Sequence, residues 1–61
     1  MDCISTKVKD MFLNGARLVK VTIDFDGEMM YKVIYSMEDF EFAVQFAEQT
    51  EASIVDAEVF I

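Results

Sequence analysis

Carboxylates are the side chains with which this sequence could do chemistry. The stretch DFDGE at residues 24–28 holds three of them around a glycine, as part of a calcium loop does. That loop also needs a bidentate Glu at its end, whereas residues 29–35 form an apolar run with a single lysine. Further pairs of carboxylates occur at Glu38 and Glu41 and at Asp56 and Glu58. We predict no metal site and no cofactor.

Catalysis is not expected from these groups. The chain has no histidine, and its single cysteine, Cys3, therefore lacks the usual base of a catalytic thiol. One cysteine excludes an internal disulfide, and we expect a reduced, partly buried thiol. General acid–base chemistry by paired carboxylates needs a concave pocket, which a domain of 61 residues rarely builds. We predict a protein without enzymatic activity that acts by binding.

Charge is unevenly distributed along the chain. The net charge is −7, and from residue 24 onward Lys32 is the only cation among ten carboxylates. This field disfavours direct contact with nucleic acid and favours a basic protein partner. The alternative is that the acids only keep an apolar chain soluble. With no run long enough to span a membrane, we expect a cytoplasmic protein without a membrane partner, in the host cytoplasm if viral.

Apolar residues make up 54% of the chain, which is more than a small monomer can hide. This surplus favours a homodimer or a tight partner.

A first helix is predicted over residues 3–15, with one apolar stripe formed by Ile4, Val8, Met11 and Phe12. Asp2 or Ser5 can cap its start, and Asn14-Gly15 can end it.

Two alternating segments, residues 17–25 and 28–36, predict strands joined by a hairpin at Asp26-Gly27. A three-residue loop, 25–27, is the preferred interpretation, because it sets Ile23 against Met29 and joins the two apolar faces. It places Lys20 opposite Lys32. The predicted core face then holds Val19, Val21, Ile23, Met29, Tyr31, Val33 and Tyr35. The opposite face would hold Leu18, Met30, Ile34, Ile54 and Phe60 and form a second contact surface.

A second helix is predicted over residues 36–50, with Ser36 and Asp39 as an approximate capping box. Phe40, Ala43, Val44 and Ala47 form the stripe expected to face the sheet. Phe42 and Phe46 lie on the far flank of this helix. The first helix, a second copy of the chain or a target protein could cover them.

A last strand is predicted over residues 52–61, with Val55, Ala57, Val59 and Ile61 on one face. The chain is therefore expected to form one α+β domain over residues 1–61, in the order α-β-β-α-β. Its sheet should be three-stranded and mainly antiparallel, with strand order 2-1-3 and two helices on one face.

Two segments of this chain resemble phage-encoded inhibitors of uracil-DNA glycosylase, in particular the very small acidic type. They are DFDGEMMYKV at residues 24–33 and SMEDFEFAV at residues 36–44, followed by a short final strand. The resemblance implies a dimer that mimics DNA and traps an apolar side chain of the enzyme in an apolar pocket. It implies a pocket and charge role for Phe40 and Glu41. Tyr31 matches a tyrosine that follows the turn in that family. The chain differs from that family at Lys32 and Val44 and by its first helix.

We therefore predict a non-enzymatic inhibitor that binds a basic DNA-processing enzyme as an acidic DNA mimic, with uracil-DNA glycosylase as the candidate target. The alternative is a small homodimeric structural or regulatory interaction module with no role related to nucleic acid. The predicted partner-binding residues are Glu28, Tyr31, Glu38, Phe40, Glu41, Phe42, Phe46, Asp56 and Glu58.

Overall fold

A computed structural model describes residues 3–61, with the side chain of Cys3 left out. The chain forms two helices and three strands in the predicted order. They are α1 (Cys3–Leu13), β1 (Val19–Phe25), β2 (Glu28–Ile34), α2 (Met37–Gln49) and β3 (Ser53–Val59). The predicted cap Asp2 and the predicted thiol environment of Cys3 lie outside the described part of the chain.

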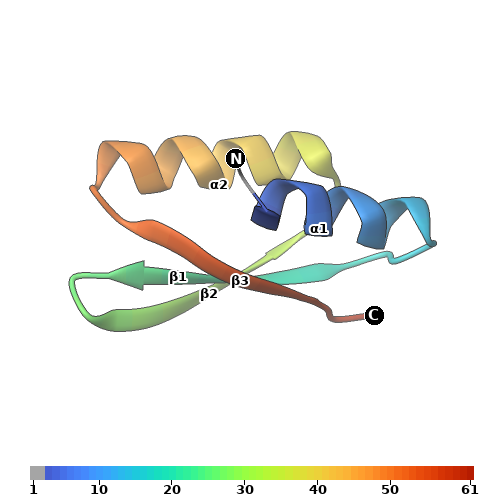
Figure 1. Cartoon of the computed structure of the whole chain (residues 1–61), viewed down its shortest axis with the longest axis horizontal. Coiled ribbons are helices and arrows are strands. Elements are labelled where there is room, and N and C mark those ends of the chain that lie inside the picture. Colours follow the sequence, from blue (N-terminus) through green and yellow to red (C-terminus); the bar gives the residue numbers. More distant parts are fainter. Residues whose placement is uncertain (1–2) are drawn as a thin grey trace.

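Both helices lie on one face of a three-stranded antiparallel sheet with the order β2-β1-β3, so the predicted fold is confirmed (Figure 1). The central strand β1 contributes Val19, Val21 and Ile23 to the layer between sheet and helices. The remaining members of this core are Val8, Ile34, Phe40 and Ala57. Within residues 3–61, no helix covers the opposite face of the sheet, called the open face below, and both β2 and β3 are edge strands.

Helix α1 presents the predicted stripe to the core. Val8 is fully buried, and Ile4, Met11 and Phe12 pack around the core as partly buried residues. Gly15 ends the helix in the left-handed region, with φ of 100°. The N–H of Ala16 donates to the carbonyl of Met11 at 3.0 Å, which is the long hydrogen bond of a Schellman motif.

The register of the hairpin differs from the prediction. Phe25 pairs with Glu28, so the loop holds two residues, and Ile23 faces Met30 rather than Met29. Asp26 and Gly27 have φ of 53° and 85°, as a type I′ turn requires, and this turn matches the twist of the strands it joins. The side chain of Asp24 adds a hydrogen bond from the N–H of Gly27, at 3.0 Å.

This register exchanges the two faces of β2. Met30 and Ile34 point toward the helices, and Lys32 lies opposite Val21 on the same side. The charge is tolerated there because β2 is an edge strand, where a lysine can bury its stem and keep its ammonium in water. The predicted core residues on β2 instead lie on the open face, namely Met29, Tyr31, Val33 and Tyr35. The predicted contact of Lys20 with Lys32 is also wrong, because Lys20 pairs with Val33.

Strand β3 contains an irregularity that the sequence pattern missed. Thr22 pairs with Asp56 but Ile23 pairs with Ile54, so Val55 is an extra residue. Ile54 therefore packs against the core, whereas Val55 is exposed. Ala57 is buried as predicted, but Val59 and Ile61 remain exposed.

Helix α2 begins and ends with recognisable caps. The hydroxyl of Ser36 accepts a hydrogen bond from the N–H of Asp39, as predicted. The Asp39 carboxylate accepts in turn from the N–H of Tyr35 at 3.0 Å. At the other end, the N–H of Ala52 donates to the carbonyl of Ala47, while Glu51 adopts a left-handed φ of 59°. That conformation normally belongs to glycine.

Replacing Glu51 with glycine should therefore stabilise the domain. The gain should be about 0.5–1 kcal/mol, because glycine adopts positive φ without steric strain. This corresponds to a thermal midpoint about 2–8 °C higher for a domain of this size. Gln49→Gly, two residues earlier but inside α2, is the matched control and should lower the midpoint. Circular dichroism melts check both, and a lower midpoint for Glu51→Gly would contradict the cap assignment.

Candidate functional site

Exposed carboxylates line the solvent face of α2 and continue to the tip of the hairpin. Their members, called the acidic band below, are Glu38, Glu41, Glu48, Glu51 and Asp26. The first three fall within an arc of about 80°, at about 100° per residue, and span about 15 Å of helix axis. Asp26 and Glu51 meet because the hairpin tip lies beside the connection after α2, where both line a shallow hollow with Phe25 and Thr50.

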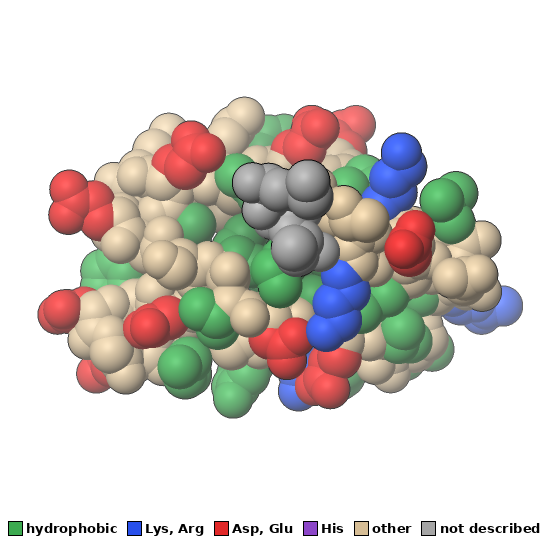
Figure 2. All heavy atoms as spheres, in the orientation of Figure 1, with side chains coloured by type: hydrophobic (Ala, Val, Ile, Leu, Met, Phe, Trp, Pro, Cys, Tyr) green, Lys and Arg blue, Asp and Glu red, His purple; other side chains and the backbone are tan. Residues whose placement is uncertain are grey.

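No cation pairs with the acidic band within the described residues. Figure 2 shows acidic side chains along the upper edge and at the left end of the molecule, where Figure 1 places α2 and the hairpin tip. The Lys and Arg side chains visible on this face lie in its centre and right half. The molecule thus has a strongly negative side, whose field attracts a positively charged surface.

An apolar groove lies between α2 and β2, on the flank of α2 that faces away from α1, whereas Glu41 and Glu48 of the acidic band border hollows on the α1 flank. It has a volume of about 320 Å³ and is lined by Ile23, Met30, Tyr31, Lys32, Phe42 and Phe46. Phe42 and Phe46 are 59% and 43% exposed, so α1 does not cover them and that alternative is wrong. They remain exposed because α1 packs on the other flank of α2, where Ser5 shares a hollow with Phe40 and Val44.

Phe40 is a core residue rather than the exposed partner-binding residue that the sequence suggests. It is 2% exposed and belongs to the core. The reason is its place on the stripe with Ala43 and Ala47, whose small side chains let α2 approach the sheet. Phe40 reaches the surface only as part of the walls of hollows on the α1 flank, one of which it shares with Ser5, Val44 and Glu41. Glu41, the neighbouring residue in that segment, is exposed.

Two predicted acids are engaged within the chain. Asp56 accepts a hydrogen bond from Lys7 of α1 at 2.9 Å, and Glu58 pairs with Lys20 at 2.8 Å. The hydrogen bond from Lys7 lowers the pKa of the Asp56 carboxyl, assisted by the backbone N–H of Ala57. The hydrogen bond to Glu58 and its charge raise the pKa of the Lys20 ammonium. Both acids therefore offer less negative charge to a partner than the acidic band does.

The open face of the sheet is a second exposed apolar surface, as expected, but with different members. It carries Met29, Tyr31, Val33, Tyr35 and Phe60, each at least 38% exposed. The ammonium of Lys20 lies 4.9 Å from the centroid of the Tyr31 ring, a cation–π contact. Together with the Lys20–Glu58 ion pair, this contact links all three strands across the open face.

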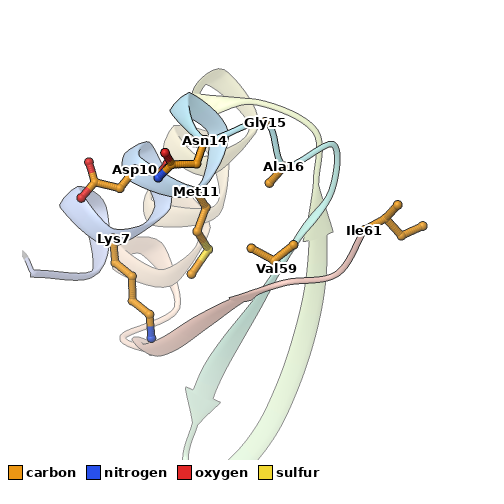
Figure 3. A pocket seen from close by; sticks show the side chains of 8 residues that line it. All are labelled: Lys7, Asp10, Met11, Asn14, Gly15, Ala16, Val59 and Ile61. Atoms are coloured by element: carbon orange, nitrogen blue, oxygen red, sulfur yellow. The ribbon is translucent and has the colours of Figure 1, made fainter.

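A larger hollow of about 490 Å³ lies beside the end of α1. Met11, Ala16, Val59 and Ile61 give it apolar walls (Figure 3). Lys7 extends from α1 toward β3 along one side, while Asp10 points away (Figure 3). Its polar residues are engaged locally: Lys7 holds Asp56, and the Asn14 amide donates to the carbonyl of Asp10 at 2.8 Å. We assign no ligand to this hollow.

The predicted site residues thus occupy separate places. Phe42 and Phe46 lie in the groove, which Tyr31 also borders although its ring lies over Lys20 on the open face. Glu38 and Glu41 belong to the acidic band, and Glu28 follows the hairpin turn. Sequence reasoning missed Met30 and Lys32 in the groove and Glu48, Glu51 and Asp26 in the band. The Asp-Gly turn signal, given full weight, predicts the two-residue loop and would have found Met30 and Lys32.

Within residues 3–61, no helix is long and apolar enough to cross a membrane. The same residues contain no group of three or more Cys, Asp or Glu side chains arranged to hold a metal ion. Comparison with protein-family models, with curated proteins and with solved structures gives no match to this chain.

Proposed function

We propose that this protein is a non-enzymatic inhibitor that binds the DNA-binding surface of a basic DNA-processing enzyme as a mimic of DNA. The observation that carries the proposal is the acidic band, with five exposed carboxylates and no ion-paired cation among the described residues. The part of the band on α2 covers about 15 Å, the axial length of about four to five phosphates of one DNA strand. A surface that binds phosphates electrostatically would also attract this band.

The apolar groove on the β2 flank of α2 supports the same proposal. Charged groups at an interface speed association and select partners, whereas buried apolar groups supply much of the affinity. Phe42 and Phe46 lie on the β2 flank of α2, and Glu41 and Glu48 lie on its α1 flank, so one helix carries both components. A band of acids that served only solubility would not require exposed phenylalanines on the same helix.

Uracil-DNA glycosylase is the first target to test, because of the resemblance in the segments around the hairpin and the start of α2. A purified bacterial glycosylase is assayed on a single-stranded oligonucleotide that contains uracil. It should lose at least about nine-tenths of its activity when the concentration of the inhibitor is ten times the Kd of the inhibitor–glycosylase complex. Reductant is added to the reactions with and without the inhibitor, so that no disulfide-linked dimer forms through Cys3. Unchanged excision at a large excess of protein would remove the glycosylase as the target.

A further inference from the structure

The outer edge of β2 is unoccupied by any other part of the described chain. The two-residue loop makes Phe25 and Glu28 the hydrogen-bonded closing pair of the hairpin, so alternation directs the polar groups of every second residue outward. These residues are Met29, Tyr31 and Val33. The next outward N–H, that of Tyr35, is taken by the Asp39 carboxylate. Three consecutive sites on this edge can therefore pair with another strand.

The two edges of the sheet differ in how they are protected. Strand β3 has its register broken at Val55, and the Lys7 side chain reaches from α1 to Asp56 on this strand. Bulges and charged side chains are the usual devices that prevent edge-to-edge pairing. Strand β2 pairs with β1 over seven residues without interruption, and its two charged side chains, Glu28 and Lys32, are of opposite sign, so a partner strand can match them. Of the two edges, β2 is the one suited to pairing.

Apolar groups flank the β2 edge on both sides. Met29, Tyr31 and Val33 lie on the open face, and Phe42 and Phe46 overhang Met30 on the helix side. A strand added at this edge would cover all of them at once. A monomer gains nothing from exposing them, whereas a symmetric partner presents the same row and buries it against itself.

Charge selects the partner and the register. In a two-fold antiparallel pair centred on Met30, Glu28 of each copy lies directly opposite the partner's Lys32, and Met29 lies opposite the partner's Tyr31. Centring on Lys32 would oppose two lysines, and centring on Tyr31 would leave Glu28 opposite the partner's Ile34. Neither Glu28 nor Lys32 has an ion pair among the described residues. Opposite charges that face each other across strands stabilise a pair, and like charges destabilise it.

We propose that two copies of this chain pair through β2 around Met30, forming a continuous six-stranded antiparallel sheet with two reciprocal Glu28–Lys32 ion pairs. Phe42 and Phe46 of the two copies then close the grooves on the helix side. This inference stands on the geometry of the edge and does not require the proposed function. If both hold, the two α2 helices run in opposite directions with their Phe42–Phe46 flanks facing each other, and Glu41 and Glu48 of each copy lie on the flank toward its own α1.

Charge exchange at the edge tests the register. Sedimentation equilibrium of the full chain under reducing conditions should give a dimer. Glu28→Lys and Lys32→Glu should each weaken the dimer at least about tenfold, because each change opposes like charges twice. The double variant Glu28→Lys/Lys32→Glu restores opposite charges and should recover the dimer to within about threefold. Circular dichroism confirms that each variant is folded.

Two results would overturn the pairing. One is a monomer at all concentrations up to about the millimolar range, where even weak association becomes visible. The other is a dimer that the single charge changes do not weaken, or that the double variant does not recover. A glycosylase assay is not involved, so failure of this test is distinct from failure of the proposed function.

A Tyr31→Pro variant, which removes one outward N–H without breaking a bond to β1, should also dissociate the dimer.

Discussion

Replacing Phe40 with alanine should leave the protein unfolded at room temperature. Phe40 is the largest core side chain that α2 contributes and is 2% exposed. Truncation of a buried phenylalanine costs about 3–5 kcal/mol, which is comparable to the whole stability that a single core supplies to a domain below about 70 residues. Far-UV circular dichroism and the dispersion of amide proton resonances measure the loss directly.

Phe60→Gln is the matched control for this change. It also removes a phenylalanine, but one that is 54% exposed on the open face of the sheet. Its cost should stay below about 1 kcal/mol, as for most surface substitutions. If Phe40→Ala melted cooperatively within a few degrees of the wild type, the core assignment of Phe40 would be wrong, and its predicted role in binding would return.

Neutralising the acidic band should remove most of the affinity for the target enzyme. The variant Glu38→Gln/Glu41→Gln/Glu48→Gln raises the net charge by three on the solvent face of α2 and keeps good helix formers. Contributions of about 0.2–1 kcal/mol per contact sum to a loss of about three- to hundredfold in Kd. The loss should appear mainly in the association rate and shrink with added salt. Surface plasmon resonance between about 50 and 300 mM NaCl measures the Kd, the association rate and the dependence of both on salt.

The control must change net charge equally without touching the band. Thr6→Lys/Asp10→Lys also raises the net charge by three, at exposed positions of α1. A local electrostatic interface predicts that this variant binds almost as well as the wild type. Equal losses for the two variants would mean that only the total charge matters, and the band would lose its proposed role.

The order of elements and the sheet topology could be predicted because the apolar patterns, the helix caps and the turn signal all indicate the same elements. The stripe around Val8, the caps at Ser36 and Gly15, and the Asp-Gly turn mark the elements independently of one another. The stripe of α2 was also correct, since Phe40, Ala43 and Ala47 are the three residues of that helix that are buried. Short connections then leave few ways to arrange three strands.

The hairpin register could not be obtained by matching apolar faces, because β2 is apolar on both sides. A slip of one residue there exchanges one apolar set for another instead of exposing a core. The three-residue loop keeps Lys32 off the face of β2 that packs against the helices. This is not necessary, because an edge strand lets the ammonium of Lys32 remain in water. The preference of Asp-Gly for a type I′ turn decides the register instead.

The acidic band is a property of the tertiary structure. Its three members on α2 follow from helical spacing, but Asp26 joins Glu51 only because the hairpin tip lies beside the end of α2. Nor does the sequence reveal that Lys7 and Lys20 engage Asp56 and Glu58, which separates these two acids from the free ones. The extra residue Val55 in β3 likewise leaves no mark in an alternating pattern.

The most direct test of the central claim is displacement of enzymes from DNA. A bacterial extract is bound to DNA-cellulose at low salt and washed with the purified protein or with the Glu38→Gln/Glu41→Gln/Glu48→Gln variant, and released proteins are identified by mass spectrometry. We predict that the wild type releases a DNA-processing enzyme with a basic DNA-binding surface and that the variant does not. Release of the same proteins in the same amounts by both, or no release by either, would contradict the account.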